Sequence, residues 1–161
     1  MSWSTTADFY YGTALSVIFN NSNGRVSAAL IESDGNRQLY KIMIDDSEYR
    51  LFIKYRFAEI ATKTEDYYGW LFTLTKNDKS EIQSLMNKGY NLVLALVCGV
   101  AGLSDSELAL IDKEQVKELI DLERDFIIIG CKKGDHVHRI SIGIGDKDAM
   151  KIKTNRVEEL F

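Results

Sequence analysis

The segment Asn91–Cys98 constrains the fold of this 161-residue chain most strongly, because after Asn91 it is apolar at every position. A strand that faces solvent on one side alternates apolar and polar residues, whereas a strand covered on both faces is continuously apolar. The run is far shorter than the roughly 20 residues that a membrane-spanning helix needs. We therefore expect a buried strand with layers packed on both of its sides.

Three strands and a helix are predicted before this segment. Residues 5–20 have apolar positions at helical spacing, and Thr5 or Thr6 can cap the helix. Tight turns, including Ser33–Asn36, separate strands over 25–32, 38–44 and 49–57. The last of these alternates most cleanly: Leu51, Ile53, Tyr55 and Phe57 face one way, and Arg50, Phe52, Lys54 and Arg56 face the other.

The rest of the sequence predicts a polar loop over 58–69 and further short elements. Asp112 and Gln115 form a capping box at the start of a helix, and the last strands are expected to pair as a hairpin. The predicted elements are a strand over 70–75, a helix over 78–88, a strand over 107–111, the helix after Asp112, strands over 126–132 and 136–144, and a further strand in the tail 149–156. Antiparallel strands joined through a helix to a covered strand indicate one α/β domain with a central mixed sheet flanked by helices.

Charge and cysteine content limit the environment of the protein. The net charge of −4 provides no global attraction to nucleic acid, and two cysteines are too few for a disulfide scaffold. No signal-peptide pattern is present, so we expect a soluble, cytoplasmic protein with reduced thiols and no membrane contact. The charge is uneven: residues 104–125 hold eight acids against three bases, and residues 37–57 hold five bases against three acids.

The strongest candidate for a chemical site lies on the second and third strands. The residue types there fit phosphodiester chemistry. Asp45 or Asp46 would bind Mg²⁺, Lys54 would stabilise the developing charge, and Lys41 and Arg56 would bind phosphate. In the alternative interpretation, the basic residues of the third strand form a solvated face and the two aspartates form a turn.

The order of helix, three strands, helix and strand, with Ile44-Asp45-Asp46 and Phe52-Ile53-Lys54 on the strands, resembles the PD-(D/E)XK nuclease-like superfamily. The resemblance covers about residues 6–98 and implies a restriction-endonuclease-like core over 1–98, with 99–161 as an extension of the same domain. In the superfamily the second strand supplies an Asp, and the third supplies an acid two residues before a Lys. Phe52 replaces that acid here. Three nearby acids could substitute for it: Asp8, Glu48 and Glu59.

Two function hypotheses follow. The first is a Mg²⁺-dependent endonuclease that uses Asp45 or Asp46 and Lys54. The second is a catalytically degenerate nuclease-like fold that binds a protein, for example as an accessory or inhibitor in a host–phage conflict or mobile-element system. Phe52, the acidic balance and the cluster Tyr67, Tyr68 and Trp70 favour the second, because exposed aromatic residues are frequent hot spots in protein interfaces.

Other motifs are incomplete. His136 and His138 with Cys131 and Asp135 could serve zinc but lack a second chelating pair, and the alternative is that they are exposed hairpin residues. A Cys98–Cys131 bridge requires neighbouring strands. The glycines around 99–102 and 143–145 lack the remaining residues of a phosphate-binding loop and are interpreted as turns.

Overall fold

A computed structural model describes residues 5–34, 36–57, 67–100, 106–132, 134, 136–141, 149–154 and 156–161. The described residues form these elements: α1 (Thr6–Asn21), β1 (Val26–Asp34), β2 (Arg37–Ile44), β3 (Ser47–Arg56), β4 (Tyr67–Thr73), α2 (Lys76–Asn87), β5 (Leu92–Cys98), β6 (Glu107–Ile111), α3 (Lys113–Asp121), β7 (Phe126–Lys132), β8 (Val137–Ser141), β9 (Ala149–Lys153) and α4 (Val157–Leu160).

The predicted mixed sheet is confirmed. Five strands lie in the order β1-β2-β3-β5-β6, in which β1, β2 and β3 form an antiparallel meander. β5 then pairs parallel to β3, and β6 pairs antiparallel to β5. The covered strand predicted from the apolar run is β5, every residue of which is buried.

A second sheet was not predicted. Its four strands lie in the order β4-β7-β8-β9 and pair antiparallel throughout. The predicted β7–β8 hairpin and the strand in the tail are both present in this sheet. The pairing of β4 with β7 joins segments that are more than 50 residues apart in sequence, so no local pattern could indicate it.

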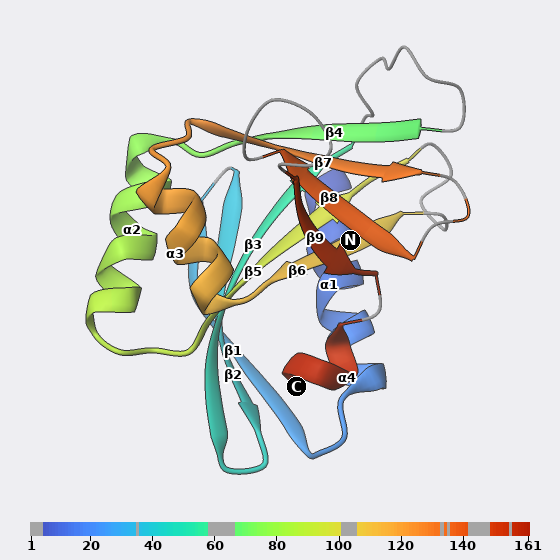
Figure 1. The fold of residues 1–161 in the computed structure, drawn as a ribbon. Coiled ribbons are helices and arrows are strands. Elements are labelled where there is room, and N and C mark those ends of the chain that lie inside the picture. Colours follow the sequence, from blue (N-terminus) through green and yellow to red (C-terminus); the bar gives the residue numbers. More distant parts are fainter. Residues whose placement is uncertain are drawn as a thin grey trace.

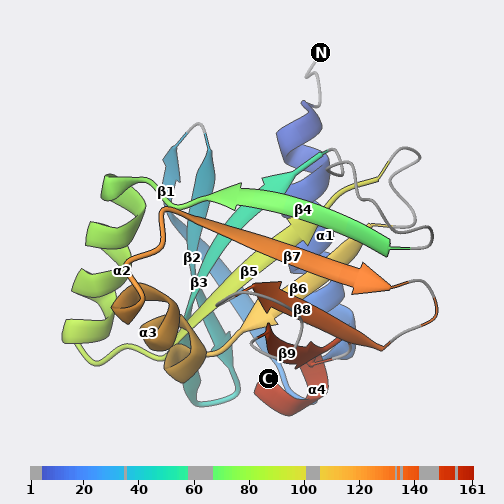
Figure 2. The same ribbon diagram turned by 45° about the horizontal axis from the view of Figure 1, so that its top comes forward.

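The first sheet lies between two cores (Figures 1 and 2). On one face, α1 packs against β3 and β5 with buried side chains that include Tyr10, Ala14 and Ile18. The other face is covered by α2, α3 and the second sheet, which crosses it in front in Figure 2. Both faces of β3 and β5 are therefore shielded from solvent.

This double coverage corrects one expectation about the third strand. Arg50 and Lys54 are buried, so the interpretation of a solvated basic face is wrong for these two residues and holds only for Arg56, which is exposed. Alternation along β3 does separate two faces. The face that carries Phe52 and Lys54 is nevertheless covered by α2 and β4.

Sequence-encoded caps fix the helix ends. Thr5 caps α1, and Asp112 with Gln115 forms the predicted capping box of α3. α2 begins two residues before the predicted Asp78, because Thr75 is its N-cap and Asp78 is the third helical residue. The side chains of Thr75 and Asp78 each accept a hydrogen bond from the backbone amide of the other residue, which satisfies two amide groups at the helix start.

Gly99 holds the end of β5 against three neighbours. Its amide donates to the Arg56 carbonyl at 2.7 Å, and its carbonyl accepts from the Trp70 indole Nε1 at 2.9 Å. A Cβ atom at Gly99 would lie 2.6 Å from the ring of Tyr10, which is buried and stacked on Tyr55. Only glycine fits here without displacing that ring.

We expect Gly99→Ala to destabilise the protein by about 1–3 kcal/mol, the range typical of overpacking. The matched control is Gly12→Ala in α1, where nothing lies within 4 Å of the added methyl group. That variant should gain roughly 0.5–1 kcal/mol, because alanine is the better helix former. Urea unfolding of both variants checks the expectation, and equal stability of the two would contradict the packing described for Gly99.

Candidate functional site

The most concentrated group of buried charges surrounds Asp78, whose side chain is completely buried. Its Oδ2 accepts from Lys54 Nζ at 2.5 Å, and its Oδ1 accepts from Arg37 Nη1 at 2.7 Å. The amide of Thr75 also donates to Oδ2 at 3.0 Å. Lys54 and Arg37 are themselves only 4% and 3% exposed, so this carboxylate binds two cations out of contact with bulk water.

Local sequence explains how these groups meet. Gln38 pairs with Ile53 across β2 and β3, so the start of β2 carries Arg37 beside Lys54 on the same face. The capping box of α2 fixes Asp78 in the first helical turn above that face. Three elements distant in sequence thus position the buried charges.

Arg37 extends the network to the sheet edge. Its Nη2 and Nε donate to Glu32 Oε1 at 2.6 and 3.1 Å, and its guanidinium lies 5.4 Å from the ring centre of Phe52. Two cations and two carboxylates balance within the group. We refer to Glu32, Arg37, Lys54 and Asp78 as the Asp78 network.

The pKa values follow from these contacts. Burial alone raises the pKa of Asp78, but hydrogen bonds from Lys54 and Arg37 outweigh it and hold that pKa below its ordinary value of 3.8. Burial alone lowers the pKa of Arg37, but the hydrogen bonds to Asp78 and Glu32 outweigh this effect and raise that pKa above its ordinary value. Asp78 and Arg37 are therefore both ionised at neutral pH.

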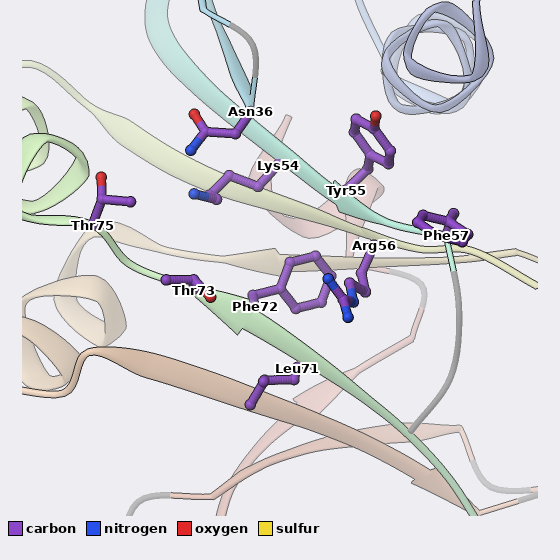
Figure 3. A pocket seen from close by; sticks show the side chains of 9 residues that line it. All are labelled: Asn36, Lys54, Tyr55, Arg56, Phe57, Leu71, Phe72, Thr73 and Thr75. Carbon is purple, nitrogen blue, oxygen red and sulfur yellow. The ribbon is translucent and has the colours of Figure 1, made fainter. Parts of the chain in front are cut away.

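A cavity of about 320 Å³ opens beside Lys54, between β3 and β4 (Figure 3). Lys54 and Arg56 lie on one side of β3 facing this space, with hydroxyl groups of Thr73 and Thr75 and the amide of Asn36 around it. The described residues that line it are Asn36, Lys54, Tyr55, Arg56, Phe57, Leu71, Phe72, Thr73 and Thr75. None of these described residues carries a carboxylate.

The structure does not bring the candidate Mg²⁺ ligands to Lys54. Asp45 and Asp46 form the turn between β2 and β3, where Asp45 has a φ of 51° and its Oδ1 accepts from the Arg25 amide at 3.0 Å. Lys54 lies seven residues beyond Ser47 along the same strand. At about 3.4 Å per residue, this is a separation of about 24 Å, far more than one metal coordination shell.

The predicted phosphate-binding pair is likewise divided. Arg56 lines the cavity, whereas Lys41 lies toward the other end of the strand, opposite Arg50, with its Nζ 3.1 Å from Glu48 Oε1. Of the five basic and acidic candidates, Lys54 and Arg56 alone share a site.

Asp8 and Glu48, two of the three acids considered as substitutes, do not approach Lys54 either. Asp8 accepts from the Thr5 amide at 2.8 Å as part of the α1 cap, and that bond lowers its pKa. Glu48 binds Lys41 and Arg50. Glu59 lies outside the described residues. Within the described ranges, no group of three His, Cys, Asp or Glu side chains is placed to hold a metal ion.

The aromatic cluster is not an exposed surface. Trp70 is 2% exposed and belongs to the core between the two sheets, which corrects its assignment as a partner-binding residue. Tyr67 and Tyr68 are half-buried, and Tyr68 packs against the same core. The physical reason is that β4 is a strand of the second sheet, whose inner face covers the first.

His138 is completely buried, so the interpretation of an exposed hairpin is wrong for it, although His136 is exposed. His138 Nε2 lies 3.3 Å from Glu107 Oε2, and this contact lowers the pKa of Glu107. Cys131 pairs with His138 across β7 and β8. Asp135 of the same predicted motif lies outside the described residues.

Both cysteines, Cys98 and Cys131, are buried. Burial raises the pKa of the Cys98 thiol well above its usual value, which favours the unreactive protonated form.

Asp78, the central residue of the network, was not among the candidate site residues predicted from the sequence. Thr75 and Asp78 have the spacing of a capping box, so its place in the first turn of α2 could have been found. Its pairing with Lys54 could not, because the capping signal does not indicate which strand the helix covers.

Comparison with known proteins adds no relative. No protein-family model, no curated protein and no solved structure matches this chain. Among the described residues, no helix has both the length and the apolar character needed to cross a membrane.

Proposed function

We propose that this protein is a catalytically degenerate nuclease-like fold that acts by binding other proteins, as an accessory or inhibitor in a host–phage conflict or mobile-element setting. One observation carries the proposal: the ammonium of Lys54, the residue that would stabilise charge in a nuclease, is bound to the buried carboxylate of Asp78. A lysine held in this way has a structural role as the counter-ion of a buried carboxylate.

The surroundings of Lys54 support the loss of catalysis. Phe52, at the position of the second acid, is completely buried in the core. Mg²⁺ binds through oxygen ligands, usually carboxylates, and the part of the cavity lining that the structure describes offers hydroxyl and amide groups without an acid. The carboxylates of Asp45 and Asp46 are about 24 Å away along β3.

Two further features support a nuclease-like binding protein. The first is the succession of α1, the three-strand meander, α2 and the parallel strand β5, which is the order on which the resemblance rests. The second is a set of large apolar side chains exposed to solvent, of which Leu30 and Ile31 are neighbours on β1. They are Phe9, Phe19, Leu30, Ile31, Phe57, Leu122 and Phe126.

A nuclease assay tests the proposal. We expect the purified protein to leave plasmid and linear DNA uncut in Mg²⁺ or Mn²⁺, at the level of an EDTA control. Metal-dependent cleavage would contradict it. In that case Lys54→Met, which keeps the aliphatic stem, is compared with the matched variant Lys41→Met. Loss of activity in the first variant alone, with its circular dichroism spectrum unchanged, would assign the activity to the cavity site.

A further inference from the structure

The cavity between β3 and β4 is lined by groups that donate hydrogen bonds (Figure 3). Arg56 presents a guanidinium, which has five N–H donors and no acceptor. The hydroxyl groups of Thr73 and Thr75 and the side-chain amide of Asn36 can donate as well. None of the lining residues that the structure describes is an acid. A cavity of about 320 Å³ with this lining fits a ligand that accepts hydrogen bonds.

Lys54 adds buried donors to the same wall. Its side chain is only 4% exposed, yet its ammonium reaches the cavity, as Figure 3 shows. An ammonium group has three N–H donors. Within the part of the chain that the structure describes, Lys54 Nζ has one hydrogen-bond partner, Asp78 Oδ2. Two N–H groups of this lysine therefore remain available to a ligand in the cavity.

The charge of the wall matches one negative charge on the ligand. In the Asp78 network two cations, Lys54 and Arg37, are balanced by two carboxylates. Arg56 is exposed, and no described carboxylate is paired with it. One cation is thus left to be neutralised by the ligand. The planar guanidinium binds a carboxylate through two parallel hydrogen bonds, so a single carboxylate is the matching group.

The remaining donors suit a peptide. Because the charge of Lys54 is already balanced, its free N–H groups and the nearby hydroxyls fit neutral acceptors, such as backbone carbonyl groups. An apolar surface adjoins them: Phe57 is 60% exposed and Leu71 is half-buried, and both line the cavity. A carboxylate, carbonyl groups and an apolar side chain occur together in a protein segment with an acidic residue next to an apolar one.

A nucleic-acid strand fits the same wall less well. Each phosphodiester also carries one negative charge, but the charges follow one another about every 3.4 Å along a strand, so binding needs a row of cations. The described lining offers Arg56 as its one unbalanced cation. The net charge of −4 provides no wider attraction to nucleic acid either.

We propose that this cavity binds an acidic side chain of a protein partner together with the apolar residue next to it. Arg56 pairs with the carboxylate, Lys54 and Thr73 donate to carbonyl groups of the same segment, and the apolar side chain packs on Phe57 and Leu71. The assignment rests on the proposed function, since it names the kind of segment that the protein recognises in its partner.

A peptide titration followed by ¹⁵N–¹H NMR tests the site. The probe is the blocked dipeptide acetyl-Glu-Leu-amide, and its neutral match is acetyl-Gln-Leu-amide. We expect the acidic probe to shift the amide signals of Phe57, Thr73 and Thr75, with a dissociation constant of about 1–10 mM or lower. It should bind at least about fivefold more tightly than the neutral probe, because hydrogen bonds to a charged group are the stronger ones.

Arg56→Gln removes the unbalanced cation from an exposed position and should keep the circular dichroism spectrum of the parent. We expect it to weaken binding of the acidic probe at least about fivefold and to change binding of the neutral probe by less than about twofold. The matched control is Arg25→Gln. Arg25 is also exposed, but it lies beside the β2–β3 turn, at the other end of β3. This variant should bind both probes as the parent does.

Three results would overturn the assignment. The first is the absence of any shift at about 20 mM acidic probe, and the second is equal affinity for the acidic and neutral probes. The third is tighter, Arg56-dependent binding of thymidylyl-thymidine, a monoanionic phosphodiester, which would assign the cavity to nucleic acid. The nuclease assay separates the two proposals. A protein that leaves DNA uncut but binds no acidic probe contradicts the cavity assignment alone, whereas metal-dependent cleavage contradicts the proposed function.

Discussion

Asp78→Ala should destabilise the protein by about 3–5 kcal/mol, because it leaves the buried charges of Lys54 and Arg37 without their shared counter-ion. Both cations lose a direct bond to the carboxylate, and Lys54 is only 4% exposed. The variant also removes the side-chain half of the α2 capping box. Chemical unfolding followed by circular dichroism measures the loss.

Two controls separate the charge from the other roles of Asp78. Asp78→Asn retains a side-chain oxygen for the cap and removes the charge, so it should still be strongly destabilised. Lys117→Ala breaks a salt bridge of similar length, 2.7 Å to Asp121, between exposed side chains. That variant should change stability by less than about 1 kcal/mol. An Asp78→Ala protein as stable as Lys117→Ala would contradict the role of Asp78 as the counter-ion of two buried cations.

The same carboxylate predicts how stability depends on pH. The pKa of Asp78 in the folded protein is below 3.8, so the unfolded chain binds a proton there before the folded protein does. Its contribution is complete above the unfolded pKa and is lost as the pH falls through the folded pKa. The stability difference between the parent protein and Asp78→Asn should therefore shrink below about pH 4. A difference that stays constant down to pH 2 would contradict a lowered pKa at Asp78.

Local pattern was sufficient for the first sheet and for most helix caps. The apolar run at β5, the alternation in β3 and the capping box at Asp112 each depend on neighbours within a few residues. Periodicity and caps are signals of this short range. These elements could be predicted, and their order implied a mixed sheet.

What local pattern could not provide was which element covers which face. The basic side of β3 has the sequence of a solvated face, yet α2 and β4 cover it, so Lys54 becomes a buried structural residue. The same limitation applied to the two aspartates of the β2–β3 turn. They precede Lys54 by only eight or nine residues in sequence, and an extended strand converts that spacing into more than 20 Å.

Trp70→Ala should cost about 3–5 kcal/mol of stability, the range for removing a large aromatic side chain from a core. Trp70 is 2% exposed between the two sheets, and its indole nitrogen is bonded to the Gly99 carbonyl at 2.9 Å. The substitution therefore leaves both a void and a buried carbonyl without its donor, and each of these raises the cost.

The size of this effect distinguishes a core residue from a partner-binding residue at the same position. Phe126→Ala on the neighbouring strand β7 removes an aromatic side chain that is 49% exposed, and should change stability by about 0.5 kcal/mol or less. Trp70→Phe, which keeps a ring but loses the N–H group, should have a stability between those of the two variants.

If Trp70→Ala instead unfolded at the same urea concentration as Phe126→Ala, the Trp70 side chain would not be part of the core. The aromatic cluster would then regain its interpretation as a contact surface. If the large loss is found, any failure of Trp70→Ala to bind a partner reports unfolding, and binding must be tested at exposed residues such as Leu30.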